Sequence, residues 1–172
     1  MKRIGVIGTG IWGTALALTA SRAGNDVLCW ARRKEVVDNI NQNHINNQYL
    51  PDIILPDTIK ATNNVEDIFD FSNVILLTVS AQYTRETLKL LKPYVKDNTI
   101  IVLCAKGIEA DSGKMLSEVA REEIPNTTIA TLNNCSITWL SDDSVIYLLP
   151  CKYPLDTDNE GITSIAVAIT LI

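Results

Sequence analysis

The sequence has little positive charge and gathers none of it in one place. Fifteen lysines and arginines stand against 20 aspartates and glutamates, the net charge is −5 at pH 7, and no basic run occurs. Because surfaces that bind nucleic acid concentrate Lys and Arg, this composition argues against nucleic acid as the main partner. An acidic chain can still bind a phosphate group where a few cations gather locally.

Metal-binding and disulfide patterns are also lacking. The four cysteines form no C-x-x-C pair: Cys29, Cys104, Cys135 and Cys151. Because two of them lie in or beside expected strands, buried reduced thiols are favoured over disulfides or a metal site. The single histidine, His44, belongs to a helix expected over 34–46. Its place on or near the apolar face favours a packing or surface role over catalysis.

Long apolar runs are absent as well. The longest, near 164–172, is too short to span a bilayer. The N-terminus enters an apolar strand directly, without the h-region of a secretory signal. Neither repeats nor a Gly/Ser linker divide the 172 residues. These absences predict a soluble, cytoplasmic protein with one domain and no membrane insertion.

What is present is organised around a glycine-rich turn. Residues 3–7 are an apolar run typical of a buried strand, G-x-G-x-x-G follows at Gly8, Gly10 and Gly13, and an alanine-rich segment begins at Thr14. In such a strand–turn–helix, the first glycine permits the turn, the second lets backbone approach a pyrophosphate, and the third allows close packing. The helix N-terminus favours an anion. We therefore predict a dinucleotide site, with glycines that serve only packing as the alternative.

The residues after the second expected strand, 26–30, bear on the choice of cofactor. Sites specific for NAD often place Asp or Glu here to hold the adenosine ribose hydroxyls, but this chain has Arg32 and Arg33. Guanidinium groups can form bidentate hydrogen bonds with a 2′-phosphate, which a carboxylate would repel. The two arginines therefore favour NADPH, or use of both NADP and NAD. The alternative is that they are solvated charges paired with Glu35 or Asp38.

Strands and helices alternate through the remaining chain. We expect strands over 58–62, 73–79, 99–104 and 127–132, helices over 83–94 and 112–124, and irregular chain between 46 and 56. This alternation predicts an α/β fold, a Rossmann-type doubly wound and mainly parallel sheet with helices on both faces. In the last helix, a stripe that includes Met115 is expected to face the core.

One lysine leaves a buried strand at the ligand-binding edge of this sheet. Lys106 follows the strand over 99–104 and precedes Gly107. A cation in that position can deliver positive charge into the crevice where open α/β sheets bind ligands. A surface loop lysine is the alternative.

Several longer segments resemble a known family. They are GTGIWGTALA (8–17), LCWAR (28–32), IN (40–41), NNQYLP (46–51), LP (55–56), IKAT (59–62) and KGIE (106–109). Together they resemble the N-terminal domain of bacterial NAD(P)-dependent glycerol-3-phosphate dehydrogenase, up to residues near 130. The resemblance implies an oxidoreductase that interconverts dihydroxyacetone phosphate and sn-glycerol 3-phosphate with NAD(P)(H), for phospholipid synthesis.

The resemblance also implies roles for single residues. In proteins similar to this one, the residues at Ile11, Trp12, Arg32, Arg33 and Lys106 line the cofactor. Lys106 also reaches the substrate, a small phosphorylated three-carbon compound. These roles agree with the physical argument: amides for the pyrophosphate, an apolar ring beside the dinucleotide, and cations for phosphate.

The chain departs from the family pattern at two strand exits. The family's V-P-S-Q is VSAQ at 79–82, and its segment like S-G-P-S-F-A is NNCSIT at 133–138, which keeps Ser136 as a substrate-binding candidate. No residue is assigned as catalytic, because the general acid/base lysine belongs to a helical second domain that we expect to be missing. We expect a dinucleotide-binding domain over 1–132. A divergent extension of it, truncated or frameshifted, follows over 133–172.

Other interpretations stay open at this point. One is that the chain is a catalytically incompetent, dinucleotide-binding fragment or remnant of that enzyme. A second is that it is another reductase with the same fold. A third alternative is an assembly protein that dimerises through an apolar tail over 159–172. The protein partners expected are accordingly a second copy of the chain or the missing C-terminal domain.

Overall fold

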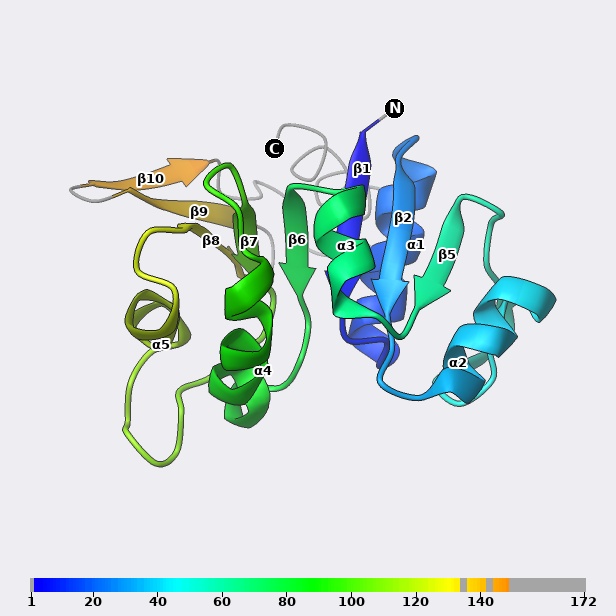
Figure 1. Ribbon diagram of the computed structural model, residues 1–172, viewed down its shortest axis with the longest axis horizontal. Coiled ribbons are helices and arrows are strands. Elements are labelled where there is room, and N and C mark those ends of the chain that lie inside the picture. The colour runs from blue at the N-terminus through cyan, green and yellow to red at the C-terminus, as the bar shows by residue number, and fades with distance from the viewer. Residues whose placement is uncertain (1, 134–135, 142–143, 149–172) are drawn as a thin grey trace.

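The chain folds into a layered α/β structure around one large sheet (Figure 1). The computed structural model describes residues 2–133, 136–141 and 144–148. The strands are β1 (Arg3–Ile7), β2 (Asp26–Trp30), β3 (Ile45–Asn46), β4 (Leu50–Ile54), β5 (Ile59–Thr62), β6 (Val74–Leu77), β7 (Ile100–Leu103), β8 (Thr128–Asn133), β9 (Ser136–Ser141) and β10 (Ser144–Leu148). The helices are α1 (Ile11–Arg22), α2 (Lys34–Asp38), α3 (Val65–Phe71), α4 (Thr84–Leu91) and α5 (Leu116–Glu123), with short helical turns η1 (Asn39–Asn43), η2 (Ala81–Tyr83) and η3 (Lys92–Tyr94).

The order of strands in the sheet creates a crevice at its centre. The order is β10-β9-β8-β7-β6-β1-β2-β5, parallel from β8 to β5, with β9 and β10 added antiparallel. The chain winds outward from β1 through β2 to β5, and then outward from β6 through β7 to β8. The two halves therefore diverge between β1 and β6, the kind of switch point at which ligands bind. The predicted Rossmann-type, doubly wound and mainly parallel sheet is confirmed.

Alternate residues of each central strand enter two separate cores. In β6, Val74 and Leu76 pack into one core with residues of α1 and α2, whereas Ile75 and Leu77 pack into the other with α3, α4 and α5. Figure 1 shows α3 in front of the sheet and α1 behind it. Because both faces are covered, the strands are apolar throughout, and each fully buried Leu or Ile contributes about 1.5–3 kcal/mol.

The segment after β2 differs from the continuous helix predicted over 34–46. α2 ends at Asp38, η1 is a π-helical turn, and His44 ends it with left-handed backbone at φ 54°. Asn41 explains the change, because its amide donates to the carbonyl oxygen of Ala61 (2.8 Å) and accepts from the Ala61 amide (2.9 Å) on the edge of β5. The chain then forms a hairpin of β3 and β4, where irregular chain was predicted.

The helix predicted over 112–124 begins later, at Leu116. Gly113 has a φ of +68°, and the Glu118 carboxylate accepts a hydrogen bond from the Met115 amide (2.8 Å), which caps α5 at that point. The prediction that Met115 faces the core is wrong, because its side chain is 62% exposed. The other residues predicted in that stripe, Leu116, Val119 and Ala120, are buried as predicted.

Buried thiols are confirmed for the two cysteines that the structure describes. Cys29 and Cys104 are buried and free. Burial raises the pKa of the Cys29 thiol to about 12 and also raises the pKa of Cys104, so neither is a nucleophile at neutral pH. Cys135 and Cys151 lie outside the described residues, as does the apolar tail over 159–172. No helix in the described part of the chain is long and apolar enough to cross a membrane.

Candidate active site

A cleft in two parts opens at the carboxyl ends of β1 and β6. The first part, about 590 Å³, lies between the residues after β2 and helix α4. The second, about 600 Å³, lies over the ends of β6 and β7. Residues of the glycine-rich turn and of the β6 exit line both parts: Gly10, Thr78, Val79 and Ser80. The two parts therefore meet at the switch point of the sheet.

The three glycines of the turn have different surroundings. A Cβ on Gly13 would lie 1.8 Å from the Gly8 carbonyl oxygen, so α1 can pack on the turn only with glycine there. Gly8 has a φ of +104°, which side chains rarely adopt. Gly10 has nothing within 4 Å of its Cβ position, and it lines the cleft. Packing therefore explains two of the glycines but not Gly10, which leaves the backbone open to a close ligand.

The N-terminus of α1 lies uncapped at the same place. Gly10 is its N-cap, no side chain caps it, and the first turn has no acidic residue. The first amides of a helix lack partners within it and form the positive end of its dipole. Because Gly10 and Ile11 line the cleft, this end of the helix favours a negatively charged group there.

Asn46 braces the turn from the hairpin, a contact that sequence reasoning missed. Its side chain is 1% exposed, and its amide donates to the Thr9 carbonyl oxygen (2.9 Å) and the Thr14 hydroxyl (2.8 Å). Thr78 holds the turn from the other side, since its hydroxyl donates to the Gly8 carbonyl oxygen (2.7 Å). The shape of the turn thus depends on residues far away in the chain.

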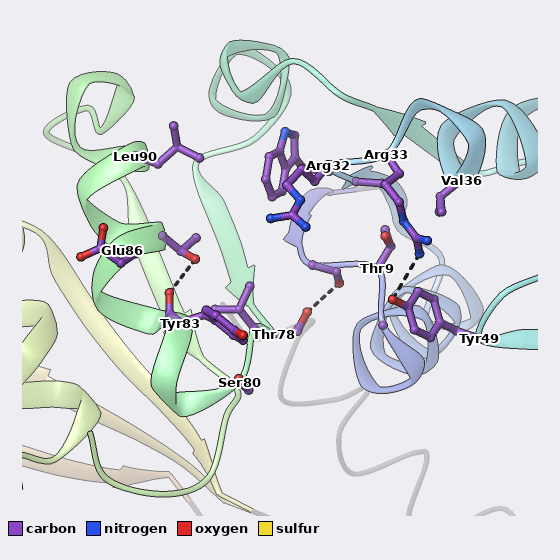
Figure 2. A pocket seen from close by; sticks show the side chains of 16 residues that line it. Thr9, Arg32, Arg33, Val36, Tyr49, Thr78, Ser80, Tyr83, Glu86 and Leu90 are labelled. Atoms are coloured by element: carbon purple, nitrogen blue, oxygen red, sulfur yellow. Dashed lines mark hydrogen bonds between the residues drawn. The ribbon is translucent and has the colours of Figure 1, made fainter. Parts of the chain in front are cut away.

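Cations line the first part of the cleft. Figure 2 shows Arg32, Arg33 and Tyr49 on one wall and Tyr83, the last residue of η2, on the other. Arg33 donates to the Tyr49 hydroxyl (3.4 Å), and its guanidinium lies 6.0 Å from the centre of that ring. In the part of the chain that the structure describes, neither arginine pairs with a carboxylate. The predicted alternative of pairing with nearby acids is therefore not observed there.

An aromatic ring and a lysine line the second part. Trp12 is 44% exposed, and its indole Nε1 donates to the Cys104 carbonyl oxygen (2.9 Å), which fixes the ring between α1 and the exit of β7. Ile11 is 63% exposed beside it. Lys106 lies in the loop after β7 and is exposed. The structure thus places apolar surface and positive charge in the same half of the cleft.

The predicted site residues divide between these surfaces. Gly8, Gly10, Arg32 and Arg33 line the first part, and Gly10, Ile11, Trp12 and Lys106 line the second. Gly13 lies beneath the turn. Ser136 is the first residue of β9, opposite Asn133 of β8, and its side chain lies outside the described ones. Tyr49 was not predicted as a site residue, although it belongs to the segment NNQYLP.

Comparisons with known proteins relate most of this chain to one family. The family model described as NAD-dependent glycerol-3-phosphate dehydrogenase N-terminus matches residues 3–138. The glycerol-3-phosphate dehydrogenase (NAD(P)+) of Paramagnetospirillum magneticum is 43% identical over 133 residues, which are 77% of this chain and 48% of that protein. The enzyme of that name from Zymomonas mobilis is 46% identical over 130 residues, 76% of this chain and 37% of that protein.

Solved structures are similar over the same region. A glycerol-3-phosphate dehydrogenase from Coxiella burnetii has a TM-score of 0.70 at 32% identity, covering 76% of this chain and 40% of that one. The yeast enzyme has a TM-score of 0.72 at 23% identity, covering 95% and 53%, and supports the fold alone. This chain spans less than half the length of the curated relatives that it matches. It belongs to the NAD-dependent glycerol-3-phosphate dehydrogenase family, through that family's N-terminal domain.

Proposed function

We propose that the two-part cleft binds NADPH or NADH, and that this chain is the cofactor-binding part of an oxidoreductase interconverting dihydroxyacetone phosphate and sn-glycerol 3-phosphate. One observation carries the proposal: open space at Gly10, beside the uncapped start of α1, where the two parts of the cleft meet. A dinucleotide fits this arrangement because its diphosphate is flanked by two nucleoside halves.

Each predicted residue has a role in this proposal. The amides of the turn from Gly8 to Gly13 hold the diphosphate, and Ile11 and Trp12 provide apolar surface for the nicotinamide half. Lys106 is the cation for the cofactor and for the substrate phosphate, with Ser136 as a further substrate contact. When bound, the nicotinamide supplies or accepts the hydride at the substrate's C2 carbon.

The two arginines after β2 support a preference for NADPH. Arg32 and Arg33 are exposed on the wall of the first part, and no described carboxylate neutralises them. Guanidinium groups so placed favour a 2′-phosphate over free ribose hydroxyls. We also propose the direction that produces sn-glycerol 3-phosphate, in the cytoplasm and for phospholipid synthesis. The cofactor-binding domain in this proposal is 1–132, and 133–172 extends it.

A second candidate function is dinucleotide binding without turnover. It is favoured by the departures from the family pattern at two strand exits, VSAQ at 79–82 and NNCSIT at 133–138. Calorimetry with NADPH and an absorbance assay of NADPH oxidation with dihydroxyacetone phosphate, both on the 172-residue chain, test binding and turnover separately. Oxidation refutes the second candidate. Binding without oxidation supports the cofactor-binding role that both candidates share, because no catalytic residue is assigned in this chain. Absence of binding refutes both.

A further inference from the structure

The loop that carries Lys106 is held unusually firmly for a surface loop. Trp12 anchors its start at the Cys104 carbonyl oxygen (2.9 Å). Gly107, with a φ of +122°, lies so close to η2 that a Cβ there would be 3.3 Å from the Ala81 Cβ. Lys106 itself has no side-chain partner among the described residues. Among the described residues, the Lys106 ammonium thus has no partner, whereas the backbone of its loop is held by neighbouring residues.

Gln82 pairs with the loop backbone on both sides of Glu109. Its amide nitrogen donates to the Ile108 carbonyl oxygen (3.0 Å), and its amide oxygen accepts a hydrogen bond from the Ala110 N–H (2.8 Å). The side chain therefore satisfies the loop backbone in the way that a neighbouring strand would. It comes from η2, directly after Ser80, which lines both parts of the cleft.

Arg85 holds the same loop through a side chain. Its Nε and Nη2 form two 2.8 Å bonds with the Glu109 carboxylate, which is 8% exposed and also accepts from the Ser112 hydroxyl (2.5 Å). The rest of the guanidinium bonds to Glu122 (2.8 Å) and Glu123 (2.6 Å) of α5. One arginine thus joins α4, the loop and α5 through charge-assisted bonds, which are the strongest hydrogen bonds of a protein surface.

Both contacts reach the loop within a few residues of Lys106, and both come from the η2–α4 segment, which also lines the first part of the cleft through Tyr83. The same segment therefore contacts the loop of Lys106 in the second part of the cleft and lines the first part. We propose that Gln82 and Arg85 are positioning residues that hold Lys106 in place for its contact with the nicotinamide half of the cofactor. This inference rests on the proposed function.

The test compares a whole cofactor with its adenosine half. Calorimetry measures NADPH and 2′,5′-ADP binding to the full chain and to Arg85→Ala, Arg85→Lys, Gln82→Ala and Lys106→Ala. We expect Arg85→Ala and Gln82→Ala to weaken NADPH by about tenfold, the scale of one charge-assisted contact, and to leave 2′,5′-ADP unchanged. Arg85→Lys, which keeps the charge but not the bidentate contact, should recover part of the affinity.

Combining Arg85→Ala with Lys106→Ala tests whether the arginine acts through the lysine. The double variant should bind NADPH no more weakly than Lys106→Ala alone. Lys96→Ala is the matched control, because it removes a 2.8 Å ion pair with Asp70 away from the cleft; it should bind both ligands like the unmodified chain.

Four results separate the ways in which this account can fail. Equal weakening of both ligands by Arg85→Ala and Gln82→Ala would overturn the positioning role, and so would undiminished NADPH affinity in both. An equal further loss in the Lys106→Ala background would also overturn it. If the unmodified chain binds neither ligand, the proposed function fails instead. Gln82→Ala keeps the test decisive if Arg85→Ala does not fold.

Discussion

Replacing the second and third glycines of the turn by alanine should affect different properties. In Gly13→Ala the new methyl group would lie 1.8 Å from the Gly8 carbonyl oxygen and 2.5 Å from the Thr78 hydroxyl, so backbone must move. Overpacking of this kind costs about 1–3 kcal/mol or more. For a chain of this size, that lowers Tm by roughly 2–12 °C.

Gly10→Ala should fold normally and bind cofactor poorly. The backbone there, φ −71° and ψ −174°, suits alanine, and nothing lies within 4 Å of the added methyl group. We therefore expect a Tm within about 3 °C of the unmodified chain, since the poorer N-cap that alanine makes is offset by the lower conformational entropy that it gives the unfolded chain. The same methyl group occupies the space that a diphosphate would need. If this overlap costs about 1–3 kcal/mol of binding free energy, the Kd for NADPH should rise roughly 5- to 150-fold.

Differential scanning calorimetry and isothermal titration with NADPH on both variants measure the two effects. A folded Gly10→Ala chain that binds NADPH as tightly as the unmodified one would refute the role given to that glycine. A Gly13→Ala chain with unchanged Tm would refute the packing argument. A clearly lower Tm of Gly10→Ala would contradict the open space at this position.

Three further predictions concern charge and hydrogen bonding. Arg32→Asp should weaken NADPH binding by about 1–3 kcal/mol more than NADH binding, measured by titration; equal losses would remove the 2′-phosphate argument. Asn46→Ala removes two buried hydrogen bonds to the segment of the glycine-rich turn, so it should lower the free energy of unfolding in denaturant by about 1–3 kcal/mol and weaken the binding of both cofactors. An unchanged free energy of unfolding would contradict the supporting role of Asn46. Hydrogen bonding to Arg85 and Ser112 lowers the pKa of Glu109 from 4.5 to about 2. The ionised Glu109 carboxylate therefore stabilises the fold above pH 4.5, and this stabilisation is lost as the pH falls toward 2. The difference in Tm between the unmodified chain and Glu109→Gln should shrink over that range. A difference that stays constant would contradict the contribution of the Arg85–Glu109 pair.

Local patterns were sufficient to predict the frame of the molecule. The glycine spacing and the apolar runs depend on neighbours in sequence, and they predicted β1, α1 and the central strands. The position of Lys106 at the cleft could be predicted because the carboxyl end of a parallel strand faces the ligand edge wherever the strand lies. The η1 turn was missed because Asn41 exchanges helical regularity for two hydrogen bonds with Ala61, a residue 20 positions away.

The supports of the site could not be predicted in this way. Asn46 bonds to Thr9 across 37 positions, and Arg85 bonds to Glu123 across 38, so neither leaves a pattern in a short window of sequence. Met115 shows the opposite error, since its spacing suited a helix stripe but the capping carboxylate of Glu118 starts the helix after it. In each case, a polar side chain outweighs the local preference of the backbone.

Thermal unfolding of the 172-residue chain with increasing NADPH tests the central claim most directly. A ligand at 100 times its Kd stabilises the native state by about 2.7 kcal/mol, which for a chain of this size raises Tm by roughly 5–10 °C. The account predicts such a rise for the unmodified chain and a smaller one for Gly10→Ala at the same concentration. A Tm that does not move in millimolar NADPH or NADH would contradict it.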